Sequence, residues 1–225
     1  MIGLQHRYPS VDWEPGGSFG GNQTRSAKPR IRRCGCGAIA MTDLLLYVTR
    51  HRGWHASAQV QEAAACSTVP ADMYDRCCRR LQRAYLPMLP FLGITGLTLA
   101  HGLNTYCVLH RLPLRFRWNM KRYNLWQTVE EGLAQDLPVV LSIGPNLPAF
   151  WKKEKLTLYR KRGEAYCAAA AVCGHYVTVT AMDGQWLEVS SWGKQYYINR
   201  EEFLRYGEAH SLFFAHNCLA VRQLP

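Results

Sequence analysis

Residues 32–48 read RRCGCGAIAMTDLLLYV, and this stretch decides the fold that we expect. A glycine on each side of Cys36 suits a tight turn, because glycine has no Cβ to restrict the backbone. From Ala38 onward the residues favour a helix that ends near residues 50–53, with Thr42 and Asp43 off its apolar face. That face comprises Gly37, Met41, Leu44, Leu45 and Val48. Cys36 is therefore expected at the first turn of a largely buried helix.

This position favours a reactive thiol at Cys36. Unpaired N–H groups and the positive end of the helix dipole stabilise an anion at the start of a helix. They lower the pKa of a thiol there, and the thiolate is the nucleophilic form. A cysteine at a helix start is also often only a small buried hydrophobe. The hypothesis of a nucleophile therefore needs a partner elsewhere in the chain.

The composition indicates a globular protein with one core. The chain has 225 residues, and 48% of them are hydrophobic. We see no apolar run long enough to span a membrane and no apolar core of a secretory signal near the N-terminus. Nine cysteines are an odd number, and Cys77 and Cys78 are adjacent, which indicates reduced thiols. Together these features predict a cytoplasmic protein.

The formal net charge of +11 is high for a chain of this size. The basic residues cluster at 25–33, 76–83, 111–122 and 152–162. Such a surface attracts acidic peptides, nucleic acid or anionic membranes. We interpret it mainly as a solvated surface that favours an acidic peptide or protein substrate. Nucleic-acid binding is the weaker alternative, because the clusters are scattered and no nucleic-acid-binding motif accompanies them.

The order of the expected elements indicates an α+β fold. Residues 1–33 are expected to form an irregular arm, and residues 34–225 a single domain. Further helices are expected at 70–85, 98–109 and 124–134, and a short one from Asn199. Strands are expected at 114–118, 138–144, 156–159, 176–182, 186–190, 195–198 and 212–221, with a basic turn at 160–164. A helical N-terminal half would thus pack on a C-terminal antiparallel sheet.

A second motif supplies a partner for Cys36. His175 follows Gly174 at the start of a strand, where its side chain can point into a cleft, although a lone histidine there is more often structural. Asp183-Gly184 is a hairpin turn signal. The next strand, which ends in EVSSWG at 188–193, would then lie beside the histidine strand and could bring an orienting group to it.

Taken in order, these motifs resemble those of the papain-like cysteine peptidase superfamily, most closely its C39-like (bacteriocin-processing-type) branch. That branch has a Cys-Gly-Pro-x-x-Leu helix start, a Gly-His-Tyr-Val-Val-Val strand, an Asp-Gly hairpin and a final Asn-Asp-Pro-Trp-Gly. Papain has Asn-Ser-Trp-Gly at the last position. The present chain has CGAIAM at 36–41, GHYVTVT at 174–180, Asp183-Gly184 and SSWG at 190–193.

The resemblance implies a papain-like fold and a cysteine hydrolase that cleaves a peptide or isopeptide amide bond without a cofactor. Cys36 would be the nucleophile and His175 its base, and the reaction would pass through a thioester acyl-enzyme. The backbone N–H of Cys36 and a second donor would stabilise the oxyanion. Trp192 would shield the hydrogen bond of the histidine from water. The same chemistry also serves acyl transfer, which stays open.

The chain departs from the family at the residue that orients the histidine. The usual Asn or Asp is a serine here, Ser190 by the papain motif or Ser191 by the C39 motif. Glu188 is a reserve candidate. A serine hydroxyl carries no charge to stabilise an imidazolium, so weaker activation is expected.

Two further departures lie before the nucleophile. The family's oxyanion glutamine stands about six residues before the cysteine, where this chain has Arg30. Gln23 is the nearest glutamine and would need a longer loop, whereas Arg30 could itself act as a cationic donor. Cys34 is a second thiol, but the residues after Cys36 match the helix start better.

Two other functions stay open. The main alternative is a catalytically weak or inactive papain-fold protein that binds peptides or a protein partner. The uncharged serine favours it. A metal site is the other, because Cys34, Cys36, Cys173 and His175 are all zinc-compatible ligands. The one-residue spacing within each pair is, however, tighter than in the usual zinc sites.

Overall fold

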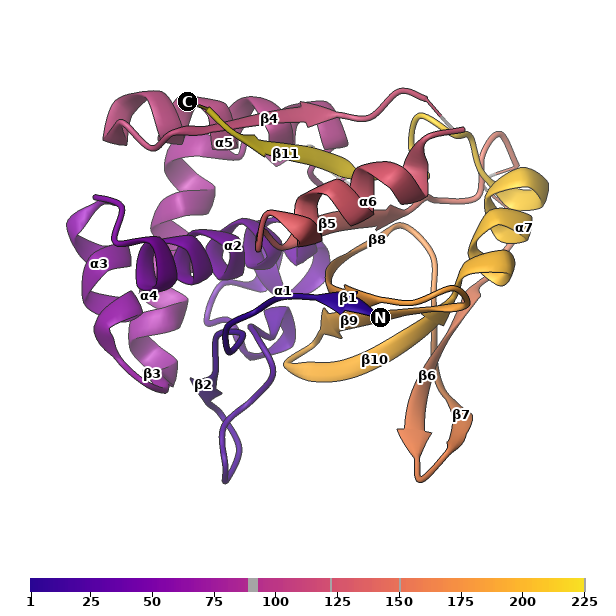
Figure 1. Cartoon of the computed structure of the whole chain (residues 1–225), viewed down its shortest axis with the longest axis horizontal. Coiled ribbons are helices and arrows are strands. Elements are labelled where there is room, and N and C mark those ends of the chain that lie inside the picture. Colours follow the sequence, from indigo (N-terminus) through magenta and orange to yellow (C-terminus); the bar gives the residue numbers. More distant parts are fainter. Residues whose placement is uncertain (89–92, 122, 150, 225) are drawn as a thin grey trace.

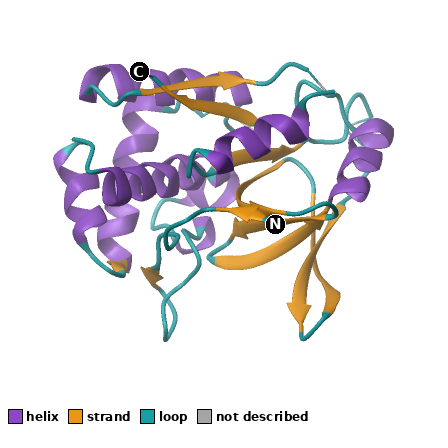
Figure 2. Cartoon of the chain, viewed as in Figure 1, coloured by secondary structure: helices purple, strands orange, loops and turns teal. Residues whose placement is uncertain are grey.

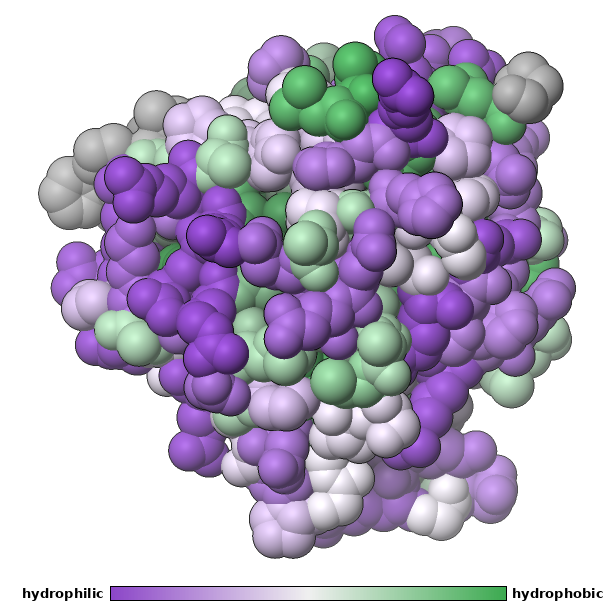
Figure 3. Space-filling model, turned by 90° about the vertical axis from the view of Figure 1, so that its left-hand side faces the viewer, coloured by the Kyte–Doolittle hydropathy of each residue, from purple (hydrophilic) through white to green (hydrophobic). Residues whose placement is uncertain are grey.

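The computed structural model describes residues 1–88, 93–121, 123–149 and 151–224. Arg122, the last residue of one basic cluster, therefore lies outside the described residues. Several helices gather on one side of the molecule, and the strands of the largest sheet lie on the other (Figures 1 and 2). The surface on the helical side is mostly hydrophilic, with hydrophobic side chains near its upper edge (Figure 3). The chain thus combines helices with an antiparallel sheet, as expected of an α+β fold.

Helix α2 (Cys36–Arg52) is the centre of the helical side, and it ends at Gly53 in the left-handed conformation with a φ of 63°. It contacts helices α1 (Pro29–Cys34), α3 (Ala58–Ala65), α4 (Ala71–Tyr85) and α5 (Gly96–His110). Thr42 and Asp43, expected off the buried face, are only 0% and 1% exposed. That expectation was wrong because α4 and the N-terminal residues cover the remaining side of the helix.

Most of the other helices after residue 53 agree with the sequence. Helices α4, α5 and α6 (Leu125–Ala134) begin and end within two residues of the expected ranges. Helix α7 (Arg200–His210) begins after the Asn199 cap, as expected, but its 11 residues make it longer than the short helix that the sequence predicts. Helix α3 was not expected, because its eight residues, AQVQEAAA, lack a periodic row of large apolar side chains.

The main sheet has the strand order β1-β8-β9-β10-β6-β7, and β5 also pairs with β8. The strands are β1 (Ile2–Gly3), β5 (Val139–Ile143), β6 (Leu156–Arg162), β7 (Ala165–Val172), β8 (His175–Met182), β9 (Trp186–Ser191) and β10 (Lys194–Asn199). All of these pairings are antiparallel. Strands β8 and β9 form the hairpin that Asp183-Gly184 predicts.

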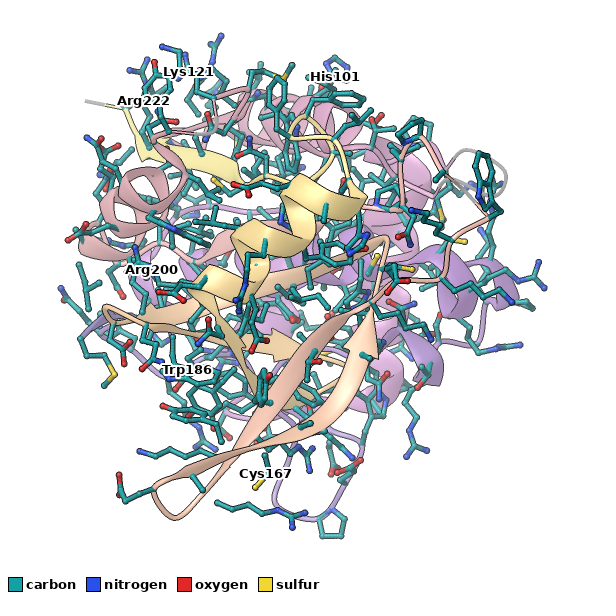
Figure 4. The ribbon with its side chains drawn as sticks, turned by 90° about the vertical axis from the view of Figure 1, so that its right-hand side faces the viewer. His101, Lys121, Cys167, Trp186, Arg200 and Arg222 are labelled. Atoms are coloured by element: carbon teal, nitrogen blue, oxygen red, sulfur yellow. The ribbon has the colours of Figure 1, made fainter. Side chains whose placement is uncertain are left out.

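The hairpin of β6 and β7 corrects the sequence interpretation. Most of the expected basic turn at 160–164 is strand, because β6 continues to Arg162. Strand β7 was not expected, since its alanine run shows no alternation of apolar and polar residues. The hairpin extends away from the body of the molecule, and Cys167 marks β7 near its far end (Figures 1 and 4).

Two small sheets complete the fold. Strand β4 (Leu114–Trp118) pairs with β11 (Leu219–Gln223), and β2 (Val11–Asp12) pairs in parallel with β3 (Val69–Pro70). The strand expected at 212–221 is therefore confirmed only in its last part. The residues before it turn back on themselves, with the N–H of His216 donating to the carbonyl of Leu212.

The N-terminal arm is more regular than the sequence predicts. Residues 1–33 supply β1 to the main sheet, β2, a short 3-10 helix η1 (Gln23–Arg25) and most of α1. The expected boundary at residue 34 falls on the last residue of α1. No helix in the described ranges is long and apolar enough to cross a membrane.

Asp136 ties the arm to the domain. Its carboxylate accepts hydrogen bonds from the N–H of Gln5 at 2.7 Å, Nδ1 of His6 at 2.7 Å and the hydroxyl of Tyr47 at 2.5 Å. Burial by itself would raise the pKa of Asp136, but these hydrogen bonds outweigh it and lower the pKa below its ordinary value.

Asp136→Ala should therefore lower the free energy of unfolding by about 2–4 kcal/mol, because several donors lose their acceptor, among them a buried hydroxyl. Urea unfolding followed by circular dichroism measures this change. Asp12→Ala, which removes an exposed carboxylate from the same arm, is the matched control and should stay close to the parent protein. Equal stability of the two variants would contradict the anchoring role.

Candidate functional site

Cys36 lies at the first residue of α2, as the glycines around it predict. Gly35 caps the helix, and a Cβ there would stand 2.5 Å from the backbone oxygen of Ile31. The thiol contacts the start of β8, where the backbone N–H of Tyr176 faces it. Burial raises the pKa of Cys36, and the N–H groups of Tyr176 and Gly37 offset only part of that rise. The expected low pKa is thus wrong, because desolvation outweighs the helix start.

His175 is the first residue of β8 and is 8% exposed. Its Nε2 lies 2.8 Å from the Ser191 hydroxyl, so Nδ1 is the ring nitrogen that Ser191 does not occupy. The imidazole stacks on Trp192, with ring centroids 4.7 Å apart and an angle of 23° between the planes. Burial lowers the pKa of His175 to about 4, so the ring is neutral at pH 7.

Of the three candidates for orienting His175, only Ser191 contacts it. The hydroxyl of Ser190 instead donates to the carbonyl of Phe19 at 2.7 Å. The carboxylate of Glu188 accepts from Thr180 at 2.8 Å. Neighbouring side chains of a strand point to opposite faces, so Ser190 and Ser191 cannot play the same role.

Trp192 reaches His175 because the chain turns sharply after β9. Its φ of 50° is left-handed, a conformation that is uncommon for a bulky residue. Gly193 follows with a φ of 72°. Backbone strain of this kind is often found at functional sites. Here it places an indole ring over the imidazole.

Gln23 lines the same pocket as Cys36, His175 and Ser191. Its Nε2 donates to the carbonyl of Arg32 at 3.2 Å, which fixes the direction of the amide. A primary amide has two N–H groups, and the described residues take only one of them. The side chain of Arg30, by contrast, donates to the carbonyl of Met88, so Arg30 is not the donor at this pocket.

The free space between these groups is about 10 Å³. That volume holds roughly one water molecule, and a carbonyl oxygen is of similar size. A thiol, an imidazole and an amide donor therefore surround a space for one oxygen atom. This arrangement can support acyl transfer through an oxyanion.

Asp43 is a pocket residue that the sequence interpretation missed. It is 1% exposed and lines the pocket from α2, two turns after Cys36. The available signal was helical spacing, since Cys36, Ala40 and Asp43 lie on one face at i, i+4 and i+7. Its polar side chain instead led us to expect a position off the buried face.

The structure does not form the zinc site that Cys34, Cys36, Cys173 and His175 could have made. No group of three His, Cys, Asp or Glu side chains in the part of the chain that the structure describes is arranged to hold a metal ion. Cys173 is exposed, whereas His175 is buried.

A scan against protein-family models found no match to this chain, and searches of curated proteins and of solved structures found none either. The chemistry of the site therefore rests on its own geometry and on the motifs that it contains.

Ser191→Asp should raise the pKa of His175 from about 4 toward its ordinary value, because a carboxylate on Nε2 stabilises the imidazolium. An NMR titration of the His175 ring measures the shift. Ser190→Ala is the control and should leave this titration unchanged, since its hydroxyl bonds to Phe19. An unshifted His175 in Ser191→Asp would rule out the assigned contact.

Proposed function

We propose that the protein is a cysteine hydrolase with a papain-like fold, similar to the C39-like peptidases, that cleaves a peptide or isopeptide amide bond. One observation carries the proposal. Cys36 and His175, which are far apart in the sequence, line one pocket in which Ser191 holds the remote nitrogen of the imidazole. Trp192 covers this hydrogen bond from one side.

The first step forms an acyl-enzyme. As the Cys36 sulfur attacks the carbonyl carbon of the substrate, Nδ1 of His175 takes the thiol proton. The carbonyl oxygen becomes an oxyanion, which the backbone N–H of Cys36 and the free N–H of Gln23 stabilise. The C–N bond then breaks, and the imidazolium returns its proton to the leaving amine.

The second step releases the acyl group. His175 removes a proton from a water molecule, whose oxygen attacks the thioester carbonyl. A second oxyanion forms and collapses, the C–S bond breaks, and the thiol recovers a proton from His175. If an amine takes the place of water, the same step is acyl transfer.

The resting pair is neutral, because burial raises the pKa of Cys36 and lowers that of His175. The thiolate therefore arises during the attack rather than before it. Hydrogen bonds to charged groups are worth about 1.5–3 kcal/mol, against about 0.5–1.5 kcal/mol for neutral ones. With the Ser191 hydroxyl as the partner of His175, acylation should be slower than with a carboxylate at that position.

Exposed basic residues on the segments that precede or pair with the reacting side chains support an acidic substrate. Arg32 and Arg33 are exposed at the end of α1, immediately before Cys36. Lys152, Lys153 and Lys155 are exposed between β5, whose last residue pairs with His175, and β6. Positive charge near both segments that carry the reacting side chains attracts acidic peptides.

The second candidate function is peptide binding without cleavage in the same pocket. The uncharged Ser191 on His175 is the observation that favours it. An activated ester separates the two functions, because it acylates a competent thiol without any need for a specific peptide sequence.

Para-nitrophenyl acetate should acylate Cys36 in the parent protein and release nitrophenol. Cys36→Ala should abolish this acylation, and His175→Ala should slow it by about 10²- to 10⁴-fold, the usual contribution of a general base. Absorbance gives the rate, and peptide mass spectrometry locates the acetyl group. Cys34→Ala is the matched control and should retain the reaction. A folded parent protein that leaves Cys36 free of acetyl would favour the binding function.

Gln23→Ala should slow acylation by about 10²- to 10³-fold, the cost of removing one oxyanion donor. Alkylation of Cys36 by iodoacetamide should change little, because displacement of iodide forms no oxyanion. The two rates are compared on the same preparation. Gln61→Ala, which removes an exposed amide on α3, should leave both rates as they are. Equal slowing of both reactions by Gln23→Ala would contradict the oxyanion role.

A further inference from the structure

Asp43 is a buried carboxylate that takes no part in the proposed acylation and hydrolysis steps. Its Oδ1 and Oδ2 accept from the backbone N–H of Gly21 at 3.1 and 2.9 Å. The hydroxyls of Tyr74, on α4, and Tyr8, in the arm, donate to it at 2.6 and 3.3 Å. All of these partners are neutral. A buried carboxylate without a cation is costly, so its presence beside the pocket calls for a role.

The carboxylate touches the loop that leads to Gln23. A Cβ on Gly20 would stand 2.6 Å from Oδ2 of Asp43 and 2.4 Å from the hydroxyl of Ser190. A Cβ on Gly21 would stand 1.9 Å from the hydroxyl of Tyr74. A Cβ at either position would displace these side-chain ends, and the backbone there lies directly against Asp43. Gln23 follows two residues later.

Asp43 and Cys36 lie on the same helix, α2. Through Gly21, Asp43 therefore links the helix of the nucleophile to the loop of the oxyanion donor. Ser190 supports the same loop from β9, since its hydroxyl donates to the carbonyl of Phe19. The loop is thus held from α2 and β9, and Tyr74 of α4 fixes the Asp43 carboxylate that holds it.

We propose that Asp43 is a positioning residue, whose ionised carboxylate holds Gly21 so that the Gln23 amide stays at the oxyanion position beside Cys36. This inference rests on the proposed hydrolase function. It assigns no contact between Asp43 and the substrate.

The role makes oxyanion stabilisation dependent on pH. Burial raises the pKa of Asp43 to about 6, although Tyr74, Gly21 and Tyr8 donate to it. The other titratable groups that face it are Tyr8, Tyr74 and Cys78, and burial raises all of their pKa values, so they stay neutral at pH 5–8. Below pH 6 Asp43 takes up a proton and becomes a donor itself, which disturbs the contact with Gly21.

The test compares two reactions of Cys36 in the full chain between pH 5 and 8. Acylation by para-nitrophenyl acetate needs the oxyanion position, and alkylation by iodoacetamide does not. Both reactions depend on the ionisation of Cys36 and His175, so the ratio of the acylation rate to the alkylation rate removes most of that dependence. In the parent protein the ratio should fall as the pH drops through about 6. Asp43→Asn should lower the ratio at pH 7.5 about 10- to 100-fold, since a misplacement of about 1 Å can cost 100-fold.

Asp43→Asn should also remove the fall of the rate ratio near pH 6, because an amide does not titrate there. Its thermal midpoint at pH 7.5 should match or exceed that of the parent protein, since a buried charge is lost while the shape is kept. A merely structural role predicts instead a lower midpoint with an unchanged ratio. An unchanged ratio, or a fall near pH 6 that persists in Asp43→Asn, would overturn the proposal.

Tyr74→Phe gives a second test if Asp43→Asn does not fold. Loss of the 2.6 Å hydrogen bond should move the fall of the ratio to higher pH, because that bond favours the ionised form of Asp43. An unmoved fall would overturn the positioning role. A failure of the proposed hydrolase function would give a different result from a failure of the positioning role. The parent protein would then show no His175-dependent acylation of Cys36.

Discussion

The contact between the start of α2 and the start of β8 is the constraint on which the rest of the structure depends. It brings the Cys36 thiol against the backbone of Tyr176, next to His175. Burial of α2 on all sides keeps this contact fixed, because a helix surrounded by packed side chains cannot shift without opening cavities. The β8–β9 hairpin then delivers Ser191 and Trp192 to the far side of the imidazole.

The pocket is built largely from neutral groups, and its main side chains are buried. The thiol and the imidazole face an amide, a hydroxyl and an indole, and the buried carboxylate of Asp43 has only neutral donors around it. Low polarity strengthens each hydrogen bond that is made and penalises each one that is lost. The arrangement thus favours charge that appears only during a reaction, such as an oxyanion, over charge held at rest.

Local sequence patterns were enough to predict the order of the main elements and to single out Cys36 and His175. They could not decide between Ser190 and Ser191, since the answer depends on which face of β9 meets His175. Gln23 could not be placed from spacing, because it begins η1 and because α1 lies between it and Cys36. Asp43 was missed because a polar residue on a helix usually faces solvent. Strand β7 was missed because alanine has little preference for strands.

The N-terminal arm gives the chain an unusual order of assembly. Ile2 and Gly3 pair with Met182 and Ala181, and the N–H of Phe19 donates to the carbonyl of Gly193. The arm therefore leaves the ribosome well before the residues that it must meet, and contacts between such distant segments form slowly. The wall of the pocket that holds Gln23 can close only after β8 and β9 have been synthesised. The helix that carries Cys36 is thus synthesised before the two strands that complete the pocket around it.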